Sequence, residues 1–254
     1  MEHHVRIHVV GGAIVVAIGI AASLITSTFL ASRAYEARGR QGASASQEIS
    51  VRGSARTRVR SDLGEWRISV RGSAPELAGA FEVLQRGTDR VSAFLKSSGF
   101  AESEFTLSPI GTETHYRRDK DGRDTRQIES FALEREVTVK SPNVDRIRSA
   151  CGEVTALLKD NVHVVSRRPA FYFTKASDLK VRILGEATSD ARARAEQVAT
   201  KSGCAVGDVR AVRMGVIQIT EPDSIDVSSE GVYDTSTIDK DVSVVVTLTF
   251  GIAA

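Results

Sequence analysis

The feature that most constrains this chain is a long stretch near its start without a charged side chain. Residues 9–32, VVGGAIVVAIGIAASLITSTFLAS, contain no Asp, Glu, Lys or Arg. As a helix, these ~24 residues span roughly 36 Å, enough to cross the ~30 Å hydrocarbon core of a bilayer with some tilt. Cleaved signal peptides have a shorter apolar region. We therefore predict a transmembrane anchor at residues 1–32. The alternatives are a cleaved signal, with Ala31 or Ala45 marking the cleavage site, and a buried core helix.

The charges that flank this stretch leave its orientation open. Arg6 precedes it, whereas Arg33, Arg38 and Arg40 follow it. Taken alone, the positive-inside rule places the large C-terminal part in the cytoplasm. The bias is small, and the rule is weak for large translocated domains.

The remaining residues have the composition of a folded domain. Residues 33–47 are polar and small, which predicts a linker between the anchor and a single α+β domain at 48–254. With 41% hydrophobic residues, the 254-residue chain can bury a sizeable core. Lys and Arg number 34 and Asp and Glu 32, a net charge of +2. This balance argues against a nucleic-acid-binding protein, which carries a strong basic excess.

Alternating hydrophobicity predicts the strands. Residues 49–60 and 66–71 alternate with a period of two, and the short SDLG connection predicts that they form an antiparallel hairpin. A second predicted hairpin joins 104–117 to 126–140, where Phe131, Leu133, Val137 and Val139 share a face. Further strands are predicted near 162–175, at 205–220 and at the C-terminus, where alternate residues from Val242 to Phe250 are apolar.

Three- and four-residue spacing of apolar side chains predicts three helices. The first is expected to end at Gly99 and to bury one stripe, formed by Leu77, Phe81, Leu84, Thr88, Val91 and Leu95. The second spans about 144–159 and places Cys151 on its core side. The third spans about 177–202, carries alanines along one side and ends at Gly203.

The predicted order is therefore β-β-α-β-β-α-β-α-β-β after the anchor. Antiparallel strands with inserted helices indicate an α+β fold in which helices pack on one face of each sheet.

The sequence carries no recognisable catalytic pattern. It has no H-E-x-x-H motif, no G-x-S-x-G elbow and no glycine-rich phosphate loop. His115 and His163 lie on predicted strands far apart in sequence. We therefore predict no catalytic residues, no cofactor and no metal site. Cys151 and Cys204 are interpreted as small buried thiols or, alternatively, as one disulfide formed in an oxidising compartment.

Two charged segments are candidate contact surfaces. Arg52, Arg56, Arg58 and Arg60 form a basic row on one strand face. This row is either a solvated surface or a contact for anionic headgroups or a partner. The loop at 221–241 carries seven acidic residues and one lysine. It is either solvated or an oligomer contact, for example against the arginine row of a neighbouring subunit.

Several short motifs, in order, resemble the SIMPL-domain family over Ile49 to Gly251. The third helix and the strand after it carry the clearest pattern: Asp190-Ala191-Arg192, Ala195-Glu196, Ala199, Gly203 and Gly207-Asp208-Val209. The strand opening with Gly53 and Ala55, the Gly99-Phe100 helix end before TLSP, and the FYFTKASDL entry to the third helix agree with it.

The resemblance implies a bacterial cell-envelope protein without established enzyme activity. Some members form ring- or channel-like oligomers, and a link to oxidative or envelope stress has been proposed. We therefore expect a non-enzymatic homo-oligomer in the bacterial inner membrane. It would span the membrane once, through residues 9–32, with the C-terminal domain in the periplasm, or else be cleaved and periplasmic. The alternative function is a periplasmic binding module for a protein or lipid that uses the Arg52–Arg60 face or the 221–241 loop.

Overall fold

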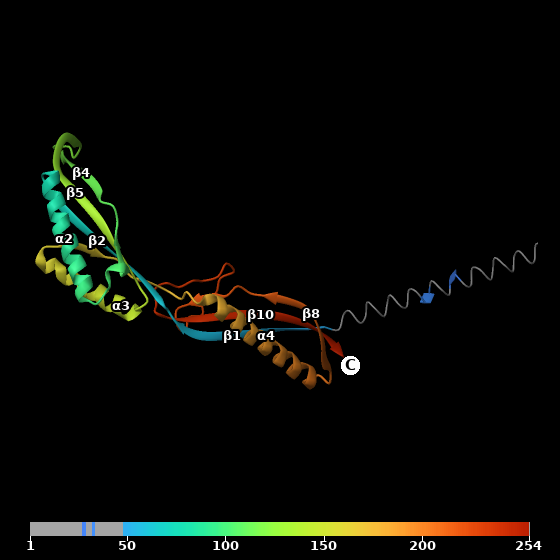
Figure 1. The fold of residues 1–254 in the computed structure, drawn as a ribbon. Helices are drawn as coiled ribbons and strands as arrows, with labels where there is room; N and C mark the ends of the chain where they lie inside the picture. Colours follow the sequence, from blue (N-terminus) through green and yellow to red (C-terminus); the bar gives the residue numbers. More distant parts are fainter. Residues whose placement is uncertain (1–26, 29–31, 34–47, 254) are drawn as a thin grey trace, which may run out of the picture. The chain divides into compact units, whose positions relative to one another are not determined.

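The computed structural model describes residues 27–28, 32–33 and 48–253 (Figure 1). The predicted anchor and linker therefore lie almost entirely outside the described residues. Among the described residues, no helix is both long and apolar enough to span a bilayer. Residues 48–253 have an α+β fold, with antiparallel sheets and the α-helices α2 (Leu77–Ser97), α3 (Val144–Glu153) and α4 (Ala176–Lys201).

The strands agree with the predicted order, except that three predicted strands are each split in two. They are β1 (Glu48–Arg60), β2 (Leu63–Ala74), β3 (Phe105–Leu107), β4 (Gly111–Arg118), β5 (Asp124–Ser141), β6 (His163–Ser166), β7 (Ala170–Tyr172), β8 (Ala205–Met214), β9 (Gln218–Thr220) and β10 (Asp239–Ala253). The second predicted helix is also shorter than expected, because its last part, Val154–Asp160, is a 3-10 helix.

The described residues form two compact units. The first contains Gly53–Asp190 and Met214–Val246. The second takes in 48–52, 191–213 and 247–253. The strands β1 and β10 and the helix α4 contribute residues to both units.

A six-stranded sheet lies within the first unit. Its order is β3-β5-β2-β6, with β4 also paired to β5 and β7 also paired to β2. All these pairs are antiparallel, and the β4–β5 hairpin predicted from the sequence is confirmed. The burial of β2 explains its central place: Trp66, Ile68 and Val70 are fully buried, whereas Arg67 and Arg71, on the opposite face of the strand, are exposed.

Helices α2 and α3 cover one face of this sheet and complete its core (Figure 1). α2 packs directly against Gly72 of β2. A Cβ atom there would lie 2.4 Å from Leu84 N and 2.5 Å from Ala80 O. Only glycine permits this contact between helix and strand.

Both long helices end at the glycines predicted to end them. Gly99 follows α2 with φ 84°, and Gly203 follows α4 with φ 74°. In each case the next residue donates its N–H back into the last turn, from Phe100 to Leu95 O and from Cys204 to Ala199 O. These are left-handed C-terminal caps, which glycine adopts without the steric cost of a Cβ.

The predicted apolar stripe of α2 is only partly buried. Its last four residues, Leu84, Thr88, Val91 and Leu95, are in the core. Leu77 and Phe81, however, are 49% and 46% exposed. The prediction of one continuous buried stripe is therefore wrong for the first turns, where side chains with the right spacing line a surface groove.

The prediction that the first two strands form a hairpin is also wrong. β1 pairs with β10 in a four-stranded sheet of order β1-β10-β8, to which β9 adds beside β10, whereas β2 belongs to the six-stranded sheet. The residues between them make bonds to different strands: Ser61 N donates to Ile238 O, and Asp62 N donates to Tyr172 O. A short connection therefore moves the chain from one sheet to the other.

The last strand and the last helix match their predicted faces. In β10, Val242, Val244, Val246, Leu248 and Phe250 are buried. In α4 every fourth residue is buried from Leu179 through Ile183 to the alanines 187, 191, 195 and 199. Small side chains at this spacing let a helix axis approach its neighbour closely, which confirms that the alanine side of α4 is a packing surface.

Candidate functional site

The arginine row on β1 is paired with acidic side chains of the same chain. Arg58 Nε lies 2.9 Å from Asp241 Oδ1, and its Nη2 lies 2.7 Å from Asp223 Oδ1. Arg56 Nε lies 3.1 Å from Asp241 Oδ2, and its Nη2 donates to Ser224 O at 2.7 Å. Arg60 forms ion pairs with Asp145 and Asp239.

Asp241 is the centre of this cluster. Its side chain is buried and also accepts a hydrogen bond from Asp223 N at 2.9 Å. Hydrogen bonds from Arg58 lower the pKa of Asp241 to about 2, against the opposing effect of burial. The same hydrogen bonds raise the pKa of Arg58. Both groups are therefore charged at neutral pH, and each largely neutralises the other.

The structure thus brings together the two charged segments that the sequence offered as separate contact surfaces. Three acids of the 221–241 segment form ion pairs with arginines of their own chain: Asp223, Asp239 and Asp241. Arg52 is exposed on the same strand. A contact of this face with a membrane or partner stays a prediction, and such a contact would have to compete with the pairs within the chain.

Two buried polar residues hold the loop between β9 and β10. Gln218 donates from Nε2 to Ser228 O at 2.8 Å and accepts from Val232 N at 2.7 Å. Lys240 is fully buried and donates to Asp234 O, Asp234 Oδ2 and Thr237 O at 2.6, 3.0 and 2.8 Å. Burial raises the pKa of Asp234, but hydrogen bonds from Thr237, Ser236 and Lys240 more than offset this, so that the pKa falls. All three Lys240 protons are used, so its role is structural.

Sequence reasoning missed Lys240, although a signal was present. Lys240 lies two residues before Val242 and four before Val244, so strand alternation places it on the same, buried side.

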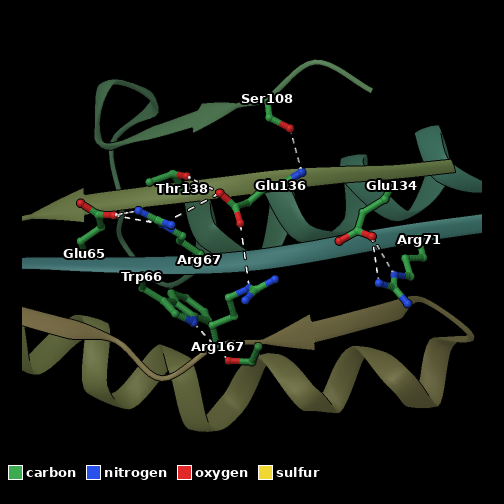
Figure 2. A network of polar contacts seen from close by, with 10 residues as sticks. Glu65, Trp66, Arg67, Arg71, Ser108, Glu134, Glu136, Thr138 and Arg167 are labelled. Atoms are coloured by element: carbon green, nitrogen blue, oxygen red, sulfur yellow. Dashed lines mark hydrogen bonds and ion pairs between the residues drawn. The ribbon is translucent and has the colours of Figure 1, made fainter. Parts of the chain in front are cut away.

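The face of the six-stranded sheet opposite α2 and α3, here called the open face, carries a row of ion pairs. Figure 2 shows Glu65, Arg67 and Arg71 of β2, Glu134 and Glu136 of the neighbouring β5, and Arg167, which follows β6. Arg67 Nη2 lies 2.7 Å from Glu65 Oε1, and Arg71 Nη2 lies 2.9 Å from Glu134 Oε2. Glu136 lies 4.0 Å from both Arg67 and Arg167. This network was not predicted, because its paired residues on β2 and β5 are far apart in sequence, as Arg71 and Glu134 are by 63 positions.

Two carboxylates of the open face, Glu65 and Glu134, are held in their charged form. A hydrogen bond from Arg67 lowers the pKa of Glu65, and one from Ser69 lowers that of Glu134. A carboxylate with a lowered pKa remains an acceptor at neutral pH and is a poor proton donor. These two carboxylates are therefore suited to holding the strands together.

Two hollows lie on opposite faces of the β4–β5 pair. On the open face, a polar hollow of about 330 Å³ is lined by Arg71, Glu113, His115 and Glu134 and reaches Gly111. On the helix face, an apolar groove of about 670 Å³ is lined by Leu77, Phe81, Ile110, Thr112 and Leu133. The exposed start of the α2 stripe therefore forms one wall of this groove.

The histidines and cysteines that the structure describes lie on different segments of the fold. His163 on β6 is opposite Arg71, and His115 on β4 lies 4.0 Å from Glu113. Cys151 and Cys204 are half-buried free thiols, and Cys151 Sγ lies 3.3 Å from Ser166 Oγ. Within the part of the chain that the structure describes, no three His, Cys, Asp or Glu side chains group closely enough to hold a metal ion.

Solved structures offer only weak likenesses. The de novo designed protein Foldit4 matches 41% of this chain and 93% of its own, at 13% identity and a TM-score of 0.22. A putative amidohydrolase/peptidase from Burkholderia cenocepacia matches 45% of this chain and 30% of its own, at 13% identity and a TM-score of 0.25. The regulatory subunit of aspartate kinase from Thermus thermophilus matches 76% of this chain and 86% of its own, at 13% identity and a TM-score of 0.18. The chain thus spans under a third of the amidohydrolase, and at these TM-scores none of the likenesses carries a conclusion.

Comparison with protein-family models identifies the family of this chain, which comparison with solved structures does not. No curated protein matches the chain. The model of the family SIMPL, described as a protein of unknown function (DUF541), matches residues 49–250. This range covers the strands and helices described above and confirms the resemblance seen in the sequence motifs. The chain belongs to the SIMPL family.

Proposed function

We propose that this chain is a non-enzymatic, membrane-anchored protein of the bacterial cell envelope that acts by self-assembly, in envelope or oxidative stress. The uncharged stretch at 9–32 supports the anchor, and the family resemblance supports a periplasmic domain and the stress role. The observation that most supports self-assembly is a set of exposed apolar side chains near β9.

These side chains form what we call the apolar surface: Met214, Val216, Ile225, Val227 and Val245. Ile225, Val227 and Met214 are 92%, 79% and 68% exposed. Gly215 N donates to Val245 O at 2.8 Å, which joins the β8–β9 connection to β10. Gln218 Nε2 donates to both Val216 O and Ser228 O, which holds the loop beside them. Side chains exposed together on a held loop and a strand are typical of a protein contact.

The alternative is a periplasmic binding module for a protein or lipid partner that uses the Arg52–Arg60 face or the 221–241 loop. The ion pairs of Arg56, Arg58 and Arg60 with Asp241, Asp223 and Asp145 favour self-assembly over this alternative, because a partner would have to displace acids already in place.

Substitution within the apolar surface tests the proposal. In the full chain in detergent, Ile225→Glu should shift the protein to a smaller species in size-exclusion chromatography with light scattering, because a charge at the centre of a contact opposes its burial. Ser229→Glu is the matched control, since it adds the same charge to an exposed position of the same loop. An unchanged oligomer for Ile225→Glu would place the contact elsewhere, and a monomeric wild-type chain would refute self-assembly.

Topology is tested separately. Protease added to intact spheroplasts should digest the domain if it is periplasmic. Protection of the domain until the cells are lysed would contradict an envelope location.

A further inference from the structure

The outer edge of β4 is an unused pairing site. In the described part of the chain, β4 pairs with β5 on one side and with no strand on the other. Seven of its eight residues are exposed, with Thr114 the exception. An edge strand presents unpaired N–H and C=O groups that can extend a sheet with another strand.

The strand stays regular along this edge. From His115 to Tyr116, the partner on β5 moves from Ser130 to Ile128, so the extra residue, Glu129, belongs to β5. From Tyr116 to Arg118, the partner moves from Ile128 to Asp124, so the extra residues of this second shift belong to β5 as well. Both irregularities therefore bend β5 and leave β4 without an inserted residue.

We propose that β4 of one chain pairs antiparallel with β4 of a second copy, about a two-fold axis at His115. The inference rests on the self-assembly proposed above and adds a contact separate from the apolar surface. The sequence of β4, GTETHYRR, is self-complementary in this register. Glu113 lies opposite the second copy's Arg117, and by symmetry Arg117 lies opposite its Glu113. Two symmetry-related pairs of oppositely charged residues thus favour this register.

The apolar groove supports the same register. Strand alternation puts Thr112, Thr114 and Tyr116 on the helix face of β4, and Thr112 lines the groove. In the proposed pair, the second copy's Tyr116 is opposite Thr114 and diagonal to Thr112, within reach of an aromatic side chain. The ring, which is 43% exposed in the single chain, would then cover the groove beside Ile110 and Phe81.

Cysteine cross-linking tests the register directly. Full-length protein in detergent carries Cys151→Ser and Cys204→Ser, so that only an introduced thiol can react. His115→Cys should form an interchain disulfide under mild oxidation, since directly opposite residues have Cα atoms about 4.5–5.5 Å apart. Thr112→Cys is the control, because two residues 112 would be about 20 Å apart in this register. Equal cross-linking at both positions, or none at 115, overturns the proposal.

Charge reversal tests it without a covalent bond. Glu113→Arg and Arg117→Glu should each weaken the dimer, on the order of tenfold in dissociation constant, because each places two like-charged pairs face to face. The double variant should recover most of this loss. If both single variants associate as the wild type does, or if the double variant remains as weak as they are, β4 is not the contact.

These outcomes separate the two proposals. An oligomer that persists without cross-linking at 115 overturns the β4 contact and leaves self-assembly standing. A chain that is monomeric at every concentration overturns both.

Discussion

On the six-stranded sheet, the face under α2 and α3 and the open face are made by alternate residues of the same strands. Trp66, Ile68 and Val70 of β2 are fully buried on the helix face. Glu65, Arg67 and Arg71 alternate with them and form ion pairs on the open face (Figure 2). Buried apolar area stabilises a fold strongly, whereas exposed ion pairs contribute little. Residues of the helix face should therefore contribute most of the free energy of unfolding, and the open face should tolerate substitutions.

The largest expected effect is at the centre of the helix face. Trp66→Ala should lower the free energy of unfolding by about 3–5 kcal/mol, because it leaves a cavity and removes the hydrogen bond that Trp66 Nε1 donates to Ser166 Oγ at 3.1 Å. Arg71→Ala on the open face is the matched control and should cost at most about 1 kcal/mol. Urea unfolding followed by circular dichroism measures both, and equal losses would contradict the difference between the faces.

Two glycines of this sheet give a finer comparison. Gly72→Ala should cost about 1–3 kcal/mol, because its Cβ would meet backbone atoms of α2 at 2.4 and 2.5 Å. Gly111→Ala, on the open face, should be nearly neutral, because the nearest atom to its Cβ is Glu134 O at 3.9 Å. The same unfolding measurement applies, and a neutral Gly72→Ala would show that α2 packs less closely than described.

Asp241 extends the comparison to a buried charge with charged partners. Asp241→Asn should cost about 1–3 kcal/mol at pH 7, because hydrogen bonds from Arg58 and Asp223 N are weakened in a buried site. The folded-state pKa is about 2, below its value near 4 in an unfolded chain. The stabilisation is therefore complete above about pH 4 and is lost as the pH falls toward 2. Unfolding of both proteins from pH 7 to pH 2 should show their difference closing, and a constant difference would exclude this cause.

The smallest expected effect belongs to the open-face ion pairs. Glu65→Gln should cost less than about 1 kcal/mol, because Arg67 and Lys140, its partners, remain hydrated. The loss should shrink further in 1 M NaCl, where exposed charges are screened. A loss above 2 kcal/mol that salt leaves unchanged would mean that the open face stabilises the fold as the helix face does.

Much of the fold follows from local patterns in the sequence. Alternation identified the buried faces of β5 and β10, and glycines marked the ends of α2 and α4. The pairing of strands was harder to predict, because alternation assigns a residue to one face of a strand and does not identify the neighbouring strand. Local pattern therefore predicts a hairpin turn at Ser61 and Asp62, whereas this short connection leads from one sheet to the other.

The candidate surfaces were predictable only in part. The arginine row and the acidic segment were found by charge, but their pairing across about 165 residues of chain needed the fold. Leu77 and Phe81 have helical spacing like the buried residues that follow, and only the extent of the packing beneath α2 decides that they line a groove. The β4 edge became visible only from the order of strands.

The central claim is that this SIMPL-family chain works by associating with copies of itself. Sedimentation velocity of the full-length protein in detergent, over a hundredfold range of concentration, measures this most directly. The account predicts a species larger than one chain that persists on dilution and becomes smaller with Ile225→Glu. A single-chain mass at every concentration would contradict it.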